Sequence, residues 1–216
     1  MNAIDAKEMD IRQLNSLLRE SVNGSRVAVK NASHIHGLGG GLKHGEVLVQ
    51  SHAGDYLAVL NDGASIKVFQ DVGNYVADNM TRGEVIIKGD AGYGAAQYCY
   101  GGSVVIYGNA GDFTATMNKG ATIIVAGNVG DEVGTYMLNG DLIVIGNAGK
   151  NFANYLIRGS VYIAGEWESL GHNTEVVALD NKDGDKLRSL FEAYEIAADP
   201  AVFKKVVAAS PKPFYK

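Results

Sequence analysis

The sequence predicts an all-β protein, a parallel β-helix of about seven coils, on the strength of three features of its middle section. A short glycine-rich motif returns at Gly89, Gly108, Gly127 and Gly146, with a step of 19 residues each time. Apolar residues and small residues form columns at the same step. A unit of this length has no room for an ordinary helix or for the four strands of a propeller blade, which leaves a stack of strand-bearing coils.

Each repeat contains a strand with one tightly specified face. The first apolar column is Val47, Ile66, Val85, Val104, Ile123, Leu142 and Val161. Two residues later, a β-branched column is formed by Val49, Val68, Ile87, Ile106, Val125, Val144 and Ile163. The residue between the two columns varies, as expected for a strand whose alternate side chains point away from the interior. Identical columns would stack about 4.8 Å apart, so the coils form a rod roughly 30 Å tall.

Small residues occupy two further columns. One column is glycine throughout, as expected where the backbone has a positive φ or where a neighbouring chain segment lies very close. It comprises Gly54, Gly73, Gly92, Gly111, Gly130 and Gly149. The other admits only very small side chains and is expected to mark the narrowest part of the interior; it comprises Ala58, Ala77, Ala96, Ala115, Gly134 and Ala153. Further glycines, from Gly63 to Gly159, mark a second corner of each coil.

A polar column lies beside these corners. It runs His52, Asp71, Asp90, Asn109, Asn128, Asn147 and Glu166. Stacked asparagines can form an amide ladder from coil to coil and can also satisfy backbone groups at corners. We therefore interpret Asn109, Asn128 and Asn147 as structural residues.

The predicted organisation is an N-terminal helical segment over 1–24, the β-helix over 25–180 and C-terminal helices with a tail over 181–216. Asp10 and Gln13 have capping-box spacing, and the helix they begin carries an apolar stripe that needs the rod end or a partner to cover it. Residues 26–45 form a degenerate first coil whose register is offset by one.

Beyond the last full coil, Trp167 is expected to pack against the end of the stack and cover it. A final strand over 176–179 and a polar turn over 180–185 precede a helix with Leu187 and Phe191 on its apolar side. Asp199 and Pro200 predict the start of a second short helix that continues through Val207. The C-terminal segment is expected to dock on the end of the rod or on a partner.

Composition excludes several classes of function. The formal charge of −5 is spread along the chain and argues against nucleic-acid binding. No apolar run predicts a signal peptide or a membrane span, so a cytoplasmic location is expected. The single cysteine, Cys99, excludes an internal disulfide and cannot alone hold an iron–sulfur cluster.

No catalytic residue and no cofactor site is predicted in this chain. The sequence lacks the Gly-x-Ser-x-Gly nucleophile motif and the Walker A motif. The glycine-rich run 89–94 lacks the strand-to-helix context of a dinucleotide site and is one copy of the repeat.

The stretch 33–41 holds the weak candidates for a metal site. His34 and His36 face the same side of an extended chain, but no cysteine or clear carboxylate completes a ligand set. A pair facing solvent or a partner is the favoured interpretation. The candidates for partner contact are His34, His36, Leu38, Phe214 and Tyr215.

Three stretches resemble a known family: the repeated Gly-x-x-Gly corners, the leading Ile4-Asp5-Ala6-Lys7 with Arg12-Gln13-Leu14-Asn15, and the closing Phe203-Lys204-Lys205-Val206. Together they resemble the GXGXG β-helix domain of glutamate synthase, in its stand-alone form. The resemblance implies a right-handed parallel β-helix that acts as a non-catalytic scaffold in a complex making glutamate or N-methylglutamate. It implies a hetero-oligomer with a class II glutaminase subunit and an FMN-binding synthase subunit.

The same resemblance places FMN, with an iron–sulfur cluster as a further option, on the partner subunits and a ferredoxin-like protein as electron donor. Two alternatives stay open. One is the related GXGXG subunit of a formylmethanofuran dehydrogenase complex. The other, from a different class, is an independent metal-binding module that uses the His34 and His36 region.

Overall fold

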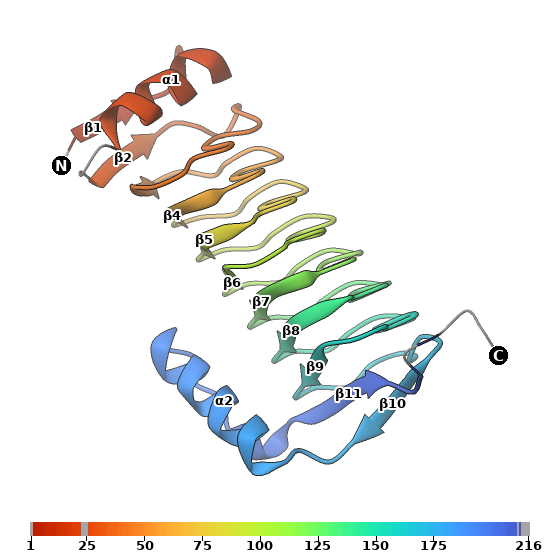
Figure 1. Cartoon of the computed structure of the whole chain (residues 1–216). Coiled ribbons are helices and arrows are strands. Elements are labelled where there is room, and N and C mark those ends of the chain that lie inside the picture. The colour runs from red at the N-terminus through yellow and green to blue at the C-terminus, as the bar shows by residue number, and fades with distance from the viewer. Residues whose placement is uncertain (1, 23–25, 211, 213–216) are drawn as a thin grey trace.

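The parallel β-helix is confirmed. In the computed structural model, which describes residues 2–22, 26–210 and 212, eleven strands form one sheet in the order β1 to β9, then β11, then β10. Figure 1 shows the coils stacked along one axis, with a helix near each end. The strands of the stack are β1 (Asn2–Asp5), β2 (Arg26–Lys30), β3 (Glu46–Val49), β4 (Asp62–Val68), β5 (Arg82–Ile87), β6 (Ser103–Ile106), β7 (Lys119–Val125), β8 (Asn139–Val144) and β9 (Ser160–Ile163).

The register of the sheet follows the sequence repeat. From β3 to β9, each residue of a column pairs in parallel with the residue 19 positions later, as Val47 does with Ile66 and Val85 with Val104. Val27 of β2 pairs instead with Val47, 20 positions later, so the predicted offset of the first coil is confirmed. Both apolar columns are completely buried, because neighbouring coils cover each side chain from above and below.

In a second wall of each coil, every second residue has a left-handed backbone conformation, that is, a positive φ. In one coil, Tyr56, Ala58 and Leu60 all have φ of 57° to 58°. The N–H groups of Tyr56 and Leu60 donate to carbonyls of the following coil, whereas that of Ala58 donates to Leu38 of the preceding coil. This alternation lets both neighbouring coils satisfy the backbone of a wall that is not a β-strand.

The left-handed conformation falls on the alanine column rather than on the glycine column. Ala96 has φ of 55° and Ala115 of 62°, and the alanines of the column are fully buried. Gly111 has no positive φ, but a Cβ there would lie 2.9 Å from the carbonyl carbon of Gly92 and from the nitrogen of Tyr93. Of the two reasons expected for glycine at this column, close approach of the backbone is the one that applies.

Helix α1 (Ile11–Ser21) closes the N-terminal end of the rod. Asp10 and Gln13 form the predicted capping box, each side chain accepting from the other's backbone N–H. Leu14 and Leu18 are fully buried in the main core, so the rod end covers most of the apolar stripe, while Leu17 is 36% exposed.

The C-terminal segment differs from the prediction in two places. Helix α2 (Asn181–Ala193) begins at the N-cap Asp180, so the expected polar turn 180–185 is its first turn; Asp180 and Asp183 cap each other reciprocally. The predicted second helix is wrong. Asp199 and Pro200 begin only the 3-10 turn η1 (Pro200–Val202), and β11 (Lys204–Ala208) follows.

Strand β11 forms because an unpaired sheet edge is available to it. It pairs antiparallel with β9 on one side and with β10 (Thr174–Val177) on the other. Its β-branched residues Val206 and Val207 suit a strand, and the pairing satisfies the edge that β9 would otherwise expose. Trp167 packs against the main core near this end and forms a bridge with Ala148 of the preceding coil.

A second core lies outside the rod. The outward residues Val105, Ile124, Ile143 and Tyr162 are completely buried beneath Leu187, Phe191 and Phe203. Figure 1 shows α2 lying along this flank of the later strands, away from the wall formed by the turns. Among the described residues, no helix is both long and apolar enough to cross a membrane.

Candidate interaction surfaces

The two histidines of the irregular stretch contact the backbone. The Nε2 atom of His34 lies 3.2 Å from the carbonyl oxygen of Met9. The Nδ1 atom of His36 accepts the N–H of Asp55 at 3.0 Å, which places the proton of the neutral ring on Nε2. In the described part of the chain, no three His, Cys, Asp or Glu side chains gather closely enough to hold a metal ion.

His36 is the first member of a ladder of side chains along one corner of the rod. Asp55 lies 19 residues later, and its Oδ1 accepts the N–H of Asn74 at 2.7 Å. The Oδ1 of Asn74 accepts the N–H of Tyr93 at 2.9 Å. Asp112 and Asp131 continue the same pattern toward the C-terminal end. The position of His36 in this series explains its backbone contact as part of the stack.

The polar column of the sequence forms a parallel ladder. Each side-chain oxygen accepts the backbone N–H of the next residue in the column, at 2.6 to 2.9 Å, in the order Asp71, Asp90, Asn109, Asn128, Asn147 and Glu166. The bonds therefore run from side chain to backbone, with one additional contact from Asn109 Nδ2 to Asp90 at 3.2 Å. Because only the oxygen is needed, Asp and Asn can replace each other along the column.

Cys99 is built into the interior of the rod. It is fully buried, and its thiol donates to the carbonyl of Ala77 at 3.1 Å. Burial raises the pKa of the Cys99 thiol to about 12. The thiolate is the reactive form of cysteine, so this environment keeps Cys99 unreactive.

Leu38 is not a surface residue. It was expected to contact a partner, but its side chain is completely buried in the main core. The glycine-rich flanks of Leu38 allow the chain to turn it inward, since Gly37 and Gly39 both have positive φ. Phe214 and Tyr215, the other apolar candidates, lie outside the described residues.

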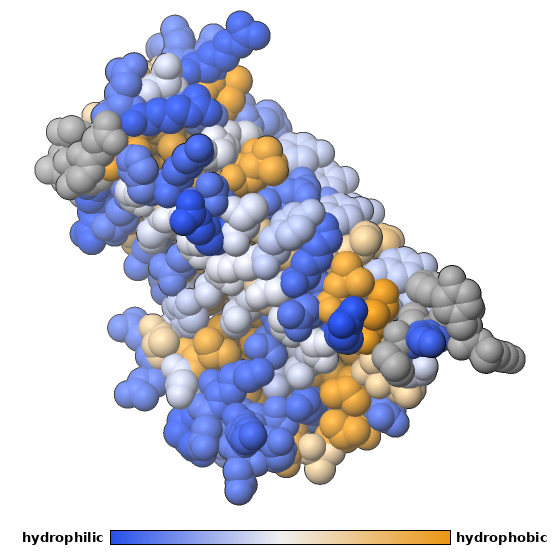
Figure 2. All heavy atoms as spheres, viewed as in Figure 1, coloured by the Kyte–Doolittle hydropathy of each residue, from blue (hydrophilic) through white to orange (hydrophobic). Residues whose placement is uncertain are grey.

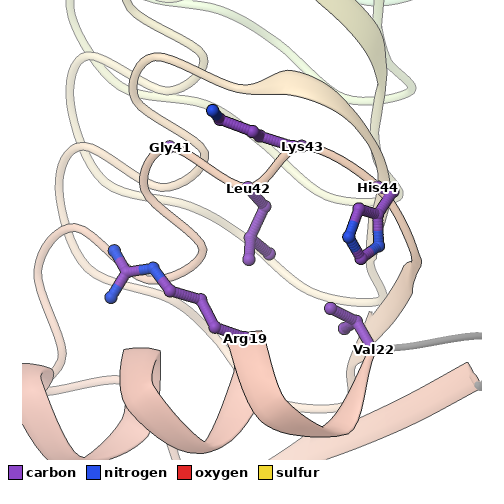
Figure 3. A pocket seen from close by; sticks show the side chains of 6 residues that line it. All are labelled: Arg19, Val22, Gly41, Leu42, Lys43 and His44. Atoms are coloured by element: carbon purple, nitrogen blue, oxygen red, sulfur yellow. The ribbon is translucent and has the colours of Figure 1, made fainter.

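A small pocket lies between the end of α1 and residues 41–44. Its volume is about 200 Å³, and it is lined by Arg19, Val22, Gly41, Leu42, Lys43 and His44. Figure 3 shows Arg19 and Lys43 reaching toward one side of the pocket and His44 lying on the other. The cationic groups surround the pocket without converging on one point. Sequence reasoning missed it because α1 and the stretch meet only when the helix closes the rod.

Comparison with family models identifies the family of this chain. A family model for the GXGXG motif matches residues 93–208, more than half of the chain. This chain belongs to the GXGXG motif family. The coils of β3 and β4 lie before the matched region but have the same register, so the GXGXG architecture extends further toward the N-terminus. No curated protein matches the chain.

The GXGXG chain presents a stripe of aromatic rings along one edge. Tyr56 and Tyr75 stack with ring centroids 4.8 Å apart, and Tyr93 and Phe113 extend the series at 5.5 and 5.1 Å. Tyr56 is 42% exposed and Tyr93 is 40% exposed. Exposed tyrosines with apolar neighbours are common at protein interfaces. The repeat alone did not predict this stripe, because Tyr93 lies one position before the column of the other three.

Hydrophobic side chains are distributed over several places on the surface. Figure 2 shows separate orange areas at both ends of the rod and along its right-hand edge near the C-terminal end. The GXGXG chain therefore offers more than one apolar area on this face.

Proposed function

We propose that the GXGXG chain is a non-catalytic structural subunit of a glutamate synthase-like complex. The observation that carries this proposal is the use made of its polar residues. The acceptor atoms of these side chains bind backbone N–H groups of the next coil, as seen at His36, Asp55 and Asn109. These side chains stabilise the stack, and the chain's value to a complex is then its rigid, extended surface.

The proposed partners are a class II glutaminase subunit and an FMN-binding synthase subunit, in a hetero-oligomer. Family membership supports this assignment, together with exposed aromatic residues at the edge of the rod. FMN, and an iron–sulfur cluster where one is used, would be bound by the partners, with a ferredoxin-like electron donor. The product would be glutamate or N-methylglutamate, made in the cytoplasm.

Reconstitution tests the proposal. The two partner subunits are purified with and without the GXGXG chain, and glutamine-dependent synthesis of glutamate, or of N-methylglutamate when methylamine is supplied, is measured with a reduced electron donor. We expect the chain alone to be inactive and the complete mixture to be active. Full activity of the partners without the chain would contradict a structural role. Glutaminase activity of the chain alone would contradict its non-catalytic assignment.

The alternatives from the sequence have less support. A metal-binding module would need further ligands beside His34 and His36, and among the described residues no three His, Cys, Asp or Glu side chains lie close enough to hold an ion. The GXGXG subunit of a formylmethanofuran dehydrogenase would have the same fold. The reconstitution distinguishes it, because such a protein would not support glutamine-dependent synthesis.

A further inference from the structure

The outer face of the sheet is covered only in part. Helix α2 contacts Tyr162 of β9 through Asp183 and pairs with Asp141 of β8 through Lys186. At its C-cap, the carbonyl of Tyr194 accepts a hydrogen bond from Tyr107, the residue that follows β6. The 11 steps from Asp183 to Tyr194 correspond to about 16 Å of helix, close to the roughly 14 Å of three strand spacings. The helix therefore runs along the stacking axis and ends at β6.

The row of outward residues continues beyond the end of α2. In the same register as Val105 lie Ile86 of β5, Lys67 of β4 and Leu48 of β3. Val105 is completely buried, whereas these three are only half-buried. Phe69, two residues after Lys67 on the same face, is 46% exposed. The apolar strip that α2 covers over β6 to β9 thus continues over β3 to β5, where Ile86 still packs against the second core and the rest of the strip lies beyond it.

Two lysines lie within this part of the strip. The ammonium of Lys67 lies 5.4 Å from the ring centre of Phe69, and that of Lys88 lies 3.3 Å from the ring centre of Tyr107. No ion pair found among the described residues includes either lysine. Both line a cavity of about 190 Å³ between the strip and the end of α2, and Glu195 lines the same cavity. The two glutamates of this face have partners of their own, because Glu46 pairs with Arg26 and Glu84 accepts a hydrogen bond from Ser65.

We propose that the outer face of β3 to β5 binds an acidic amphipathic helix of another protein, placed in line with α2. The strip crosses three strands, which is two strand spacings or about 10 Å, and this matches roughly two turns of helix. Apolar residues of that helix would contact Leu48, Phe69 and Ile86, as Leu187 and Phe191 contact the later strands. Its carboxylates would pair with Lys67 and Lys88. A second copy presenting the same face would bring these lysines against each other, so charge disfavours that occupant.

Site-specific cross-linking tests the proposal in the native cells. A photoreactive amino acid is placed at position 69 of the full chain and, as a matched control, at position 100, where Tyr100 is 55% exposed and lies outside the strip. We expect position 69 to capture a segment of another protein with apolar residues at helical spacing and acidic neighbours. Capture of a second copy, capture of a segment without acidic residues, or no capture would overturn the proposal.

Binding of a synthetic peptide with the captured sequence gives the second readout. The K67E/K88E variant should bind it about tenfold more weakly or worse, since reversal leaves like charges facing each other. The control is K119E, because Lys119 also lies over an aromatic ring, 4.0 Å from that of Tyr100, but outside the strip. Equal losses in both variants, or no loss in K67E/K88E, would contradict the proposed contact.

The docking surface does not depend on the complex that the chain serves. An acidic helix captured from a protein that is neither a glutaminase nor a flavoprotein would support the surface and contradict the proposed function. Conversely, recovery of both partners with this chain, while position 69 captures neither of them, would support the proposed function and reject the docking surface.

Discussion

Two glycines of this chain differ in what surrounds them, although both have ordinary φ values. A Cβ added at Gly111 would lie 2.9 Å from backbone atoms of the preceding coil, which cannot move without disturbing the stack. A Cβ at Gly184, inside α2, would meet nothing within 4 Å. The glycine at position 111 is therefore required by packing, whereas the glycine at position 184 only weakens a helix.

These surroundings predict opposite effects of the same substitution. Gly111→Ala should destabilise the chain by about 1 to 3 kcal/mol, because it overpacks the contact between coils. Gly184→Ala should stabilise it by up to about 1 kcal/mol through helix propensity. Urea unfolding followed by circular dichroism measures both. Equal midpoints for Gly111→Ala and the parent would show that the coils are not as closely spaced as described.

At two corners of the rod, an alanine bonded to a buried asparagine stands where other coils have a glycine, and the glycine comes one residue earlier, at Gly63 or Gly120. Gly83, Gly102, Gly140 and Gly159 turn the corner with φ between 84° and 97°. The equivalent residues Ala64 and Ala121 have no positive φ, and each exchanges two hydrogen bonds with the buried side chain of Asn61 or Asn118. At the four corners that turn with glycine, the position of the asparagine, three residues earlier, is occupied by Met80, Cys99, Met137 or Leu156.

This pairing predicts a compensating double substitution. Asn118→Met alone should cost about 1 to 3 kcal/mol, because it leaves the backbone of Ala121 without its buried partner. Adding Ala121→Gly should recover much of the loss, since the corner can then adopt the geometry seen at Gly140. A double-mutant cycle from urea unfolding measures the coupling. Additive effects of the two changes would contradict the exchange between asparagine and glycine.

At the residue scale, the sequence predicts which columns are small or polar but not the reason for each. The repeat indicated close packing or positive φ at Gly111, and only the structure assigns close packing there and positive φ to Ala96. Leu38, in the irregular stretch between Gly37 and Gly39, was expected to contact a partner. Those glycines instead turn its side chain into the core.

At the scale of elements, α2 is attached by one buried polar cluster as well as by its apolar face. Asp183, whose side chain is 7% exposed, accepts from Tyr162 at 2.7 Å and from Lys205 at 2.7 and 3.0 Å. Burial alone would raise the pKa of Asp183, but the hydrogen bonds from Lys205 and Tyr162 outweigh it and lower the pKa to about 2. The cluster joins α2 to both β9 and β11.

The lowered pKa makes the attachment sensitive to acid. The pKa of Asp183 is lower in the folded chain, about 2, than its ordinary 3.8, so its stabilising effect is present above about pH 4 and is lost between about pH 4 and pH 2. The loss from this group should be about 2 kcal/mol. Unfolding free energies of the parent and of Asp183→Asn, measured across this range, should converge as the pH falls. Parallel curves would contradict the assignment.

The elements show where sequence patterns are reliable and where they fail. The capping box at Asp10 predicted α1 correctly because it is a local interaction. Residues 204–207 were expected to be helical, yet they belong to β11, which pairs with the edge of β9, a partner far away in the sequence. The apolar outward residues Val105, Ile124 and Ile143 were the available signal that something covers the sheet.

At the scale of the molecule, the stack is extended, and each coil interacts mainly with its two neighbours. Both ends are closed by non-repeating elements, α1 at one and the β10–β11 pair at the other. These elements interrupt the register of the coils at both ends, although the sheet still ends in β1 and β10, each paired on one side only. The flanks are further surfaces that other proteins can contact. The aromatic stripe and the outer face of β3 to β5 are two such flanks.

Mild affinity purification of the tagged chain from its native cells tests the central claim most directly. Mass spectrometry identifies the proteins that accompany it, and a visible spectrum detects a flavin. We expect a glutaminase-like chain and a yellow FMN protein in fixed proportion to the GXGXG chain. A chain that purifies alone, without a flavin spectrum and without either partner, would contradict the scaffold function.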